Sequence, residues 1–427
     1  MIVTFAVKNY KSFNQQVSLS LIASALKETY ALPAKAATTY TRGLPILPVA
    51  AIFGANASGK SNLIDAMAMM KFHIQTSLAK DNVINKIQVE PFLLSIASRN
   101  QPTEFEISFL TEQKLFRYGF LAGKDRVFEE WLYEKELKER AKEKELYYRQ
   151  EDSLDYHPTL FKVGKVIQEQ RLAKESVLIL TLAYQLNDEL AKTVMEWFIN
   201  FNVLKGHEYD GYKDFSLRQI EDETDIAGEM KELIRYADTG IRDLSTAILF
   251  GNPEVLAHHA VFDEKGEATD EYMLILDKQE SEGTKKFFNL SGPVLNSLKY
   301  GKVLVIDELD AQLHPNLMEK LVQMFQDRRI NTKSAQLIFA GHNTSVLSAH
   351  LLRRDQVWIT EKNKYGATSL YSIAEYKSAK GKARNKEAIE QNYLGGKYGG
   401  VPFLGDLENF LEQYAHVRQR RNNRRTI

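Results

Sequence analysis

The 427-residue sequence contains no cysteine, only 3 tryptophans and 10 prolines, and no excess of charge of either sign. Without cysteine it cannot form disulfides, thiolate metal sites or a cysteine nucleophile, which fits a reducing compartment. Lysine and arginine number 56, and aspartate and glutamate also number 56. This neutral balance argues against a dedicated nucleic-acid coat protein, although it does not exclude a local basic patch.

Long hydrophobic runs are also missing. The longest ones, such as residues 176–186 and 303–306, are too short to cross about 30 Å of hydrocarbon. The first residues show no basic segment followed by an apolar core and a cleavage site. With 44% hydrophobic and 26% charged residues, the composition is that of a globular protein. We therefore expect a soluble, cytoplasmic protein with no membrane partner.

A complete phosphate-binding loop, G-x-x-x-x-G-K-[ST], lies between an apolar run of strand length and apolar residues at helical spacing. Its glycines allow backbone N–H groups to turn toward phosphates at the positive end of a new helix. We expect Lys60 to reach the β- and γ-phosphates and Ser61 to ligate Mg²⁺. The residues predicted to bind the nucleotide are Gly54, Ala55, Asn56, Ala57, Ser58, Gly59, Lys60, Ser61 and Asn62.

A pair of acidic residues far downstream forms the second part of the predicted site. Residues 303–306, Val-Leu-Val-Ile, are typical of a buried parallel strand, and Asp307 and Glu308 follow directly. The carboxyl ends of such strands are where α/β sheets place their chemistry. We expect Asp307 to hold Mg²⁺ through water, and Glu308 to orient and deprotonate the attacking water. The long separation from the phosphate loop predicts an inserted segment.

These segments together resemble the ABC-type ATPases of the SMC, RecF and OLD group. The opening residues Phe-Ala-Val-Lys-Asn-Tyr-Lys-Ser-Phe look like the first strand of that group, in which Lys8 and Asn9 would approach the nucleotide. The segment Gln-Glu-Ser-Glu-Gly-Thr is similar to a degenerate ABC signature, with Ser281 and Gly283 in its two informative places. The resemblance implies that these two residues contact the γ-phosphate of ATP bound to another subunit.

Two further residues carry the same resemblance. Asp310 matches the D-loop aspartate, and the histidine and proline that follow it are typical of the group. His342 ends an apolar strand-like segment, as the switch histidine does, and the resemblance implies that it senses or stabilises the γ-phosphate. The resemblance implies ATP and Mg²⁺ as cofactors. The preference for ATP over GTP is inherited from the resemblance, since no guanine-specific N-K-x-D tract is evident.

The closer resemblance is to stand-alone prokaryotic AAA-family ATPases of anti-phage and restriction-linked operons, of the RloA type and, more distantly, the ATPase subunit of PARIS. Residues 392–403 look like the ending of that subgroup, and residues 91–92 and 102–107 also match it. The likeness is thin between about 135 and 240. It implies a homodimer or higher oligomer with ATP sandwiched between heads, and a protein effector encoded nearby, such as a nuclease or an RloB-like protein.

The predicted fold class is α/β: a P-loop NTPase with an ABC-type head, built from a mixed sheet and antiparallel strands, and with an inserted helical subdomain. We assign residues 1–134 to the N-terminal lobe of the head and residues 135–245 to a mainly helical insert. Residues 246–400 form the C-terminal lobe with the signature, the acidic pair and the switch histidine. Residues 401–427 form a C-terminal helix and a basic tail.

Within these parts, alternating apolar residues predict strands at 102–134 and again at 254–278. The charged segment 135–150 is compatible with either a helix or a hairpin. Residues 166–204 and 216–237 have helical periodicity, but neither segment sustains clean heptads. A long SMC coiled coil is therefore excluded, and a compact helical insert is expected.

The C-terminal segment is strongly basic. Five arginines lie close together here: Arg418, Arg420, Arg421, Arg424 and Arg425. A solvated basic tail is the commoner interpretation of such a run, whereas contact with DNA or RNA phosphates is the alternative. No aromatic residue is interleaved with the arginines, so no stacking platform for single strands is present.

The function predicted from these observations is an ATP-binding, ATP-hydrolysing switch. It would dimerise through ATP held between two heads and control a partner effector, in anti-phage defence through abortive infection. Two alternatives remain open. One is a nucleotide-locked scaffold that holds a toxin or nuclease with little turnover. The other is a DNA-repair ATPase of the RecF or SMC kind.

Overall fold

The structure is a computed structural model in which the chain is described at most positions. The described residues are 1–26, 44–78, 87, 89–111, 114–138, 140–206, 210–237, 240–249, 251–347, 351–378, 381–382, 388–402 and 410–414. The five arginines predicted to form a basic tail lie outside these residues, as does most of the predicted C-terminal helix.

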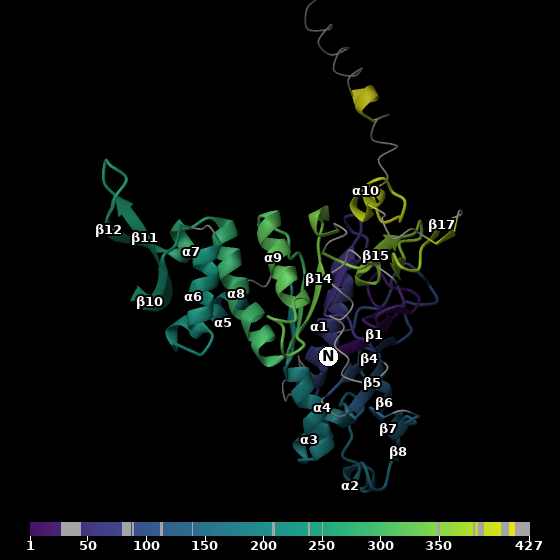
Figure 1. The fold of residues 1–427 in the computed structure, drawn as a ribbon. Coiled ribbons are helices and arrows are strands. Elements are labelled where there is room, and N and C mark those ends of the chain that lie inside the picture. Colours follow the sequence, from purple (N-terminus) through teal and green to yellow (C-terminus); the bar gives the residue numbers. More distant parts are fainter. Residues whose placement is uncertain are drawn as a thin grey trace, which may run out of the picture.

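The centre of the molecule is a sheet, of which β14 and β15 are labelled in Figure 1. Its strands are, in this order, β16 (Thr368–Ser372), β15 (Val357–Lys362), β3 (Val49–Phe53), β14 (Gln336–Ala340), β13 (Val303–Ile306) and β9 (Phe201–Leu204). Neighbouring strands run parallel, except that β15 and β16 form an antiparallel pair at one edge. β14 lies between β3 and β13 and runs parallel to both, so the carboxyl ends of these three strands meet at the same edge of the sheet.

Both faces of the central sheet are buried, as is usual for parallel strands. Along β3, Ala50 and Ile52 belong to one hydrophobic core, whereas Val49, Ala51 and Phe53 belong to the other. The first core also contains residues of α1 (Lys60–Thr76), α3 (Ile179–Gln185) and α4 (Glu189–Ile199). The second core contains residues of α5 (Asp210–Glu221), α6 (Ala227–Tyr236), α8 (Glu282–Tyr300) and α9 (Pro315–Gln326).

An antiparallel sheet packs against the first core. Its strands are β2 (Val17–Ser20), β1 (Ile2–Lys8), β4 (Thr103–Leu110), β5 (Lys114–Ala122), β6 (Val127–Glu136), β7 (Lys144–Gln150) and β8 (Ser153–Tyr156), in this order. The alternation predicted for residues 102–134 is confirmed, since β4 buries Phe105, Ile107 and Phe109 on one face. Of the charged segment 135–150, residues 144–150 form β7, which pairs with β6 as a hairpin, and the described residues of the segment are not helical.

The segment predicted as a mainly helical insert, residues 135–245, contains strands as well as helices. Its helices are α2 (Val163–Glu169), α3, α4, α5 and α6. Strands β7 and β8 extend the antiparallel sheet, and β9 pairs with β13 in the central sheet. Helices α3 and α4 lie in the first core, whereas α5 and α6 pack against α8. The division into domains stays a prediction, and the segment contributes to both cores.

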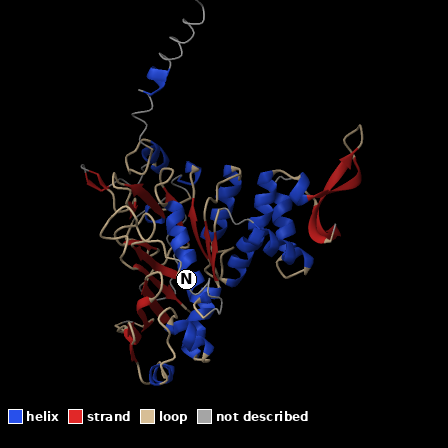
Figure 2. Ribbon diagram, turned by 180° about the vertical axis from the view of Figure 1, so that it is seen from behind, coloured by secondary structure: helices blue, strands red, loops and turns tan. Residues whose placement is uncertain are grey.

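A separate three-stranded sheet stands beyond α5, α6 and α8 at one end of the molecule (Figure 1, and from behind in Figure 2). It consists of β10 (Asp243–Leu249), β11 (Asn252–Phe262) and β12 (Ala268–Ile275), which confirms the strands predicted for residues 254–278. The remaining short elements are α7 (Leu276–Gln279), η2 (Thr344–Leu347), η3 (Arg354–Gln356), β17 (Lys377–Ser378), β18 (Gly381–Lys382) and α10 (Ile389–Leu394).

The architecture confirms the predicted α/β class, with a mixed central sheet, helices on both of its faces and an additional antiparallel sheet. The phosphate-binding loop connects β3 to α1, which is the strand–loop–helix arrangement of a P-loop NTPase. None of the described helices is long and apolar enough to cross a membrane.

Candidate nucleotide-binding site

The phosphate-binding loop opens onto a cavity of about 520 Å³ at the carboxyl edge of the central sheet. The residues after β13 and β14 lie on the same cavity, so the structure brings together three segments that are far apart in the sequence. The lining residues are Asn56, Ala57, Ser58, Gly59, Lys60, Ser61, Asn62, Asp307, Glu308, Ala340, Gly341, His342 and Lys362.

The backbone of the loop is turned for anion binding. Gly59, which directly precedes α1, has a φ of 113°, a conformation that glycine adopts at low cost. A Cβ at this position would lie 2.6 Å from the Thr368 hydroxyl oxygen, so a larger residue would also collide with β16. The backbone N–H groups at the start of α1 are consequently free to meet a phosphate at the positive end of the helix.

Lys60 lies within the loop and is only 6% exposed. Its ammonium group donates hydrogen bonds to the carbonyl oxygens of Gly54 (2.8 Å) and Ala55 (3.1 Å). Burial lowers the pKa of Lys60, and the carboxylates of Asp307 and its neighbours oppose that shift. The lysine is thus a buried cation hydrogen-bonded to two carbonyl oxygens, and it can exchange these partners for phosphate oxygens.

Asp307 fits the binding of a hard cation. Its carboxyl group accepts a hydrogen bond from the Ser61 hydroxyl, while its Oδ1 is buried and has no hydrogen-bond partner among the described residues. Burial raises the pKa of Asp307. A carboxylate oxygen and a hydroxyl oxygen side by side are ligands that suit Mg²⁺, which also takes phosphate oxygens and waters. No cluster of three or more metal-ligating side chains occurs among the described residues, and a nucleotide-bound Mg²⁺ does not need one.

Glu308 has a backbone φ of 53°, which is unusual for a residue other than glycine. Its carbonyl oxygen accepts hydrogen bonds from the Ala311 N–H (3.1 Å) and from the ammonium group of Lys286 (2.6 Å). Its carboxyl group lies beside Gly206, where an added Cβ would come within 3.3 Å of Oε2. The turn after β13 therefore carries Glu308 to the cavity in a fixed, strained conformation.

Asp310 connects the turn after β13 to the loop after β14. Its Oδ2 accepts hydrogen bonds from the backbone N–H groups of His342 (2.6 Å) and Asn343 (2.5 Å). Burial, and secondarily the nearby Lys60, lower the pKa of His342, while the carboxylates around it oppose the shift. A neutral imidazole is therefore favoured at the cavity, where it can donate or accept a hydrogen bond.

Several residues that brace the loop give no signal in the sequence. The Thr368 hydroxyl lies within hydrogen-bond distance of the Ser58 carbonyl oxygen (2.7 Å) and the Ser12 hydroxyl (2.8 Å). The Thr360 hydroxyl pairs with that of Ser58 (2.6 Å). The exposed Lys362 adds a cation to the cavity from the end of β15. Thr360 and Lys362 lie on β15 and Thr368 lies on β16. The pairing of β15 with β3 brings this β15–β16 hairpin next to the loop.

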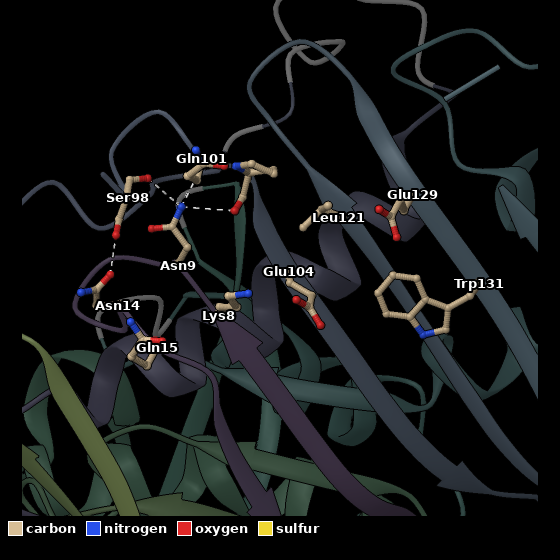
Figure 3. Close-up of a pocket in the computed structure, with 11 residues that line it drawn as sticks. Lys8, Asn9, Asn14, Gln15, Ser98, Gln101, Glu104, Leu121, Glu129 and Trp131 are labelled. Atoms are coloured by element: carbon tan, nitrogen blue, oxygen red, sulfur yellow. Dashed lines mark hydrogen bonds between the residues drawn. The ribbon is translucent and has the colours of Figure 1, made fainter. Parts of the chain in front are cut away.

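Lys8 and Asn9 line a different cavity, of about 380 Å³, at the end of the antiparallel sheet (Figure 3). The Asn9 side-chain amide donates to the carbonyl oxygens of Ser98 (2.9 Å) and Gln101 (2.8 Å) and fixes the loop that precedes β4. Glu104, the cross-strand neighbour of Lys8, and Glu129 also line this cavity. The contact of Lys8 and Asn9 with a nucleotide stays a prediction, since neither residue lines the cavity at the phosphate loop.

Ser281 and Gly283 lie at the start of α8 and do not line their own chain's cavity. Ser281 is exposed, and its hydroxyl oxygen accepts a hydrogen bond from the Thr284 N–H (3.2 Å) as the helix cap. A Cβ at Gly283 would lie 2.8 Å from the Gln312 carbonyl oxygen, so the helix packs closely on the turn after β13. Contact with a nucleotide on another subunit stays a prediction for both residues.

The family model described as "AAA domain, putative AbiEii toxin, Type IV TA system" matches residues 49–348. The chain belongs to this AAA-domain family. The predicted resemblance to AAA-family ATPases is thereby confirmed at the level of the family, while the resemblance to the RloA and PARIS subgroups is not tested. No curated protein matches the chain in sequence.

Solved structures that resemble the chain include an SMC head bound to the C-terminal winged-helix domain of ScpA, which is 13% identical with a TM-score of 0.40 and covers 87% of this chain and 97% of its own. The SMC head domain from Thermotoga maritima is 17% identical with a TM-score of 0.37, and the match covers 87% of this chain and 98% of that domain. RecF with ATP is 13% identical with a TM-score of 0.30, and the match covers 87% of this chain and 97% of the RecF chain. At these identities and scores, the family assignment rests on the sequence match alone.

Proposed function

We propose that this protein binds Mg-ATP at the phosphate loop and hydrolyses it, and that the nucleotide state switches the protein between two conformations. The observation that carries the proposal is the convergence of Lys60, Asp307, Glu308 and His342 on one cavity. Phosphoryl transfer to water requires mainly positioning and neutralisation of charge, and these residue types supply both.

Each residue has a distinct role in the proposed reaction. Lys60 would leave the loop carbonyl oxygens and bind the β- and γ-phosphates. Asp307 and Ser61 would hold Mg²⁺, which neutralises phosphate charge when bound. Glu308 would orient the attacking water and accept its proton, and His342 would hydrogen-bond the γ-phosphate. The lowered pKa of His342 supports its acting as a neutral group.

We further propose that two copies enclose the nucleotide. The exposed Ser281 and the closely packed Gly283 lie at the start of α8, where they are accessible to a second subunit. Their predicted partner is the γ-phosphate on the other subunit, and Asp310 would connect the two sites through the loop of His342. ATP hydrolysis would then open the dimer, which is a switch driven by one phosphate.

The proposed biological role is control of a protein effector in anti-phage defence, in the manner of the RloA-type and PARIS ATPases. The family description, which names a toxin and a toxin–antitoxin system, supports this context. The effector would be a nuclease or an RloB-like protein. The absence of cysteine fits a reducing compartment such as the cytoplasm.

The solution mass of a Glu308→Gln protein, with and without Mg-ATP, tests the proposal. The variant should bind ATP and hydrolyse it only very slowly, so its mass should at least double when Mg-ATP is added. A Lys60→Ala variant is the control and should stay at its starting mass. An unchanged mass, with ATP binding verified by calorimetry, would refute the sandwich and favour a nucleotide-locked scaffold with little turnover.

A further inference from the structure

A buried lysine connects the helix that follows the signature-like segment to the turn that carries the acidic pair. Lys286 lies in the second turn of α8 and is only 4% exposed. Its ammonium group donates a hydrogen bond of 2.6 Å to the carbonyl oxygen of Glu308. The preceding residue, Lys285, instead pairs with Glu282 at the surface (2.8 Å). Because burying an ammonium group is unfavourable, the contact of Lys286 requires a compensating role.

That role is connected with the unusual backbone of Glu308. A left-handed conformation costs about 1–3 kcal/mol for a residue other than glycine and persists only where its surroundings enforce it. The bond from Lys286 and the bond from the Ala311 N–H both end on the Glu308 carbonyl oxygen, and the Leu309 N–H donates to Ala340 (3.1 Å). A rotation of Glu308 to an ordinary conformation would break its bonds and move its carboxyl group.

The charges around Lys286 support the same role. Burial lowers the pKa of Lys286 to about 8, while the carboxylates of Asp310, Glu308 and Asp307 oppose that shift. These carboxylates follow one another within a single turn and would repel each other without a nearby cation. Lys286 supplies such a cation in addition to Lys60, which acts on the same carboxylates.

The same helix contacts the turn at a second point. Gly283, one helical turn before Lys286, packs so closely that an added Cβ would lie 2.8 Å from the Gln312 carbonyl oxygen. Ser281 caps the helix at its exposed end. A force applied at Ser281 or Gly283 therefore acts on a helix that also holds the carbonyl group of Glu308.

We propose that Lys286 is a positioning residue that keeps Glu308 in its left-handed conformation and couples the start of α8 to it. When the nucleotide of a second subunit engages Ser281 and Gly283, α8 adjusts the position of Glu308 through Lys286. Hydrolysis then proceeds only in the closed dimer. This inference rests on the proposed ATPase function and concerns the regulation of the same site.

Steady-state ATP turnover and ATP binding of Lys286→Met, Lys286→Arg and Lys285→Met test the inference. Lys286→Met removes the cation at nearly constant volume and should lower kcat on the order of 10²-fold, as a small misplacement of a catalytic group does. Its ATP affinity and its ATP-dependent mass increase should be retained, which also shows that the variant is folded. Lys286→Arg should recover part of the turnover, and Lys285→Met should match the unchanged protein.

A double-variant comparison separates positioning from general damage. If Lys286 acts through Glu308, the Lys286→Met change should cost almost nothing further in a Glu308→Gln background. Equal turnover of Lys286→Met and Lys285→Met would overturn the inference while leaving the proposed function intact. If the unsubstituted protein binds ATP but does not hydrolyse it, the result would instead refute the proposed function.

Discussion

The carboxyl group of Glu130, next to the start of α3, is fully buried, and that of Asp307, at the end of β13, is half-buried. The two differ in the hydrogen bonds that they receive. Glu130, on β6, accepts bonds from the hydroxyl groups of Tyr118 (3.0 Å) and Tyr147 (2.8 Å). It also accepts bonds from the backbone N–H groups of Ile179 (2.6 Å) and Leu180 (3.0 Å), at the start of α3. Both of its oxygens are thus used within the protein.

The Asp307 carboxyl group accepts hydrogen bonds from the Ser61 hydroxyl and the Glu308 backbone N–H, whereas its buried Oδ1 has no partner among the described residues. Burial raises the pKa of both carboxyl groups, so a shifted pKa does not distinguish them. Their hydrogen bonds distinguish them. A carboxylate with hydrogen bonds to both oxygens stabilises the fold, whereas one with an unpaired oxygen at a cavity is available to a ligand. The difference predicts opposite effects of substitution in the two regions.

The largest effect should follow from Asp307→Asn. The amide keeps the size of the side chain but cannot balance the charge of Mg²⁺, so ATP turnover should fall on the order of 10²-fold or more. The free energy of unfolding should not decrease, since burial already disfavours the charged carboxyl group and the amide oxygen can still accept a hydrogen bond from Ser61. Turnover assays and urea unfolding of the variant measure the two quantities. A large loss of stability with turnover retained would show that Asp307, like Glu130, mainly stabilises the fold.

Glu130→Ala should show the reverse pattern. The change leaves two tyrosine hydroxyl groups and two helix N–H groups without their acceptor, so the free energy of unfolding should fall by about 3 kcal/mol or more. Turnover per folded molecule should stay within about twofold, because Glu130 is not one of the residues that line the cavity. Glu129→Ala is the matched control, since Glu129 accepts a bond from Tyr148 at the partly exposed side of the same strand.

The first core also contains a buried base, His73 on α1, whose ring lies 5.7 Å from that of Phe120. Its Nε2 has no hydrogen-bond partner among the described residues, and burial lowers its pKa from 6.5 to about 4. The folded state therefore binds fewer protons than the unfolded state in this range. Stability should decrease as the pH falls from 6.5 toward 4, by about 3 kcal/mol at most.

A His73→Leu variant should lack this part of the acid destabilisation, which urea unfolding at a series of pH values can detect. The carboxyl groups with raised pKa values contribute in the opposite sense, because they lose stability as the pH rises. Parallel pH profiles for the variant and the unchanged protein would show that His73 is not the group responsible.

The smallest effect is expected at the hairpin beneath the phosphate loop. Thr368→Val keeps the shape of the side chain but removes the hydroxyl group that contacts Ser12 and Ser58. The loop should be less well ordered, and ATP affinity should fall by about 1 kcal/mol, the contribution of one hydrogen bond. Calorimetry with the exposed Ser369→Ala variant as control measures the difference. An unchanged affinity would show that the Thr368 hydroxyl group does not help to order the loop for the nucleotide.

Much of the site could be predicted because its parts are local. The phosphate loop is contiguous, with apolar residues on either side that form β3 and α1 as expected. The acidic pair directly follows a buried strand, β13. The charged segment 135–150 could not be assigned from its own residues, because only pairing with β6 decides between a hairpin and a helix.

The sequence by itself determined where the phosphate loop lies. It supplies glycine at position 59, where the loop adopts a φ of 113°, and the local periodicity of the residues that follow specifies a helix. Only the tertiary structure decided that β14 lies between β3 and β13, and thereby that Asp307 meets Ser61. It also decided the contacts of Thr368 and Lys286. Strand order and helix packing depend on burial between distant segments, and no local pattern of residues encodes them.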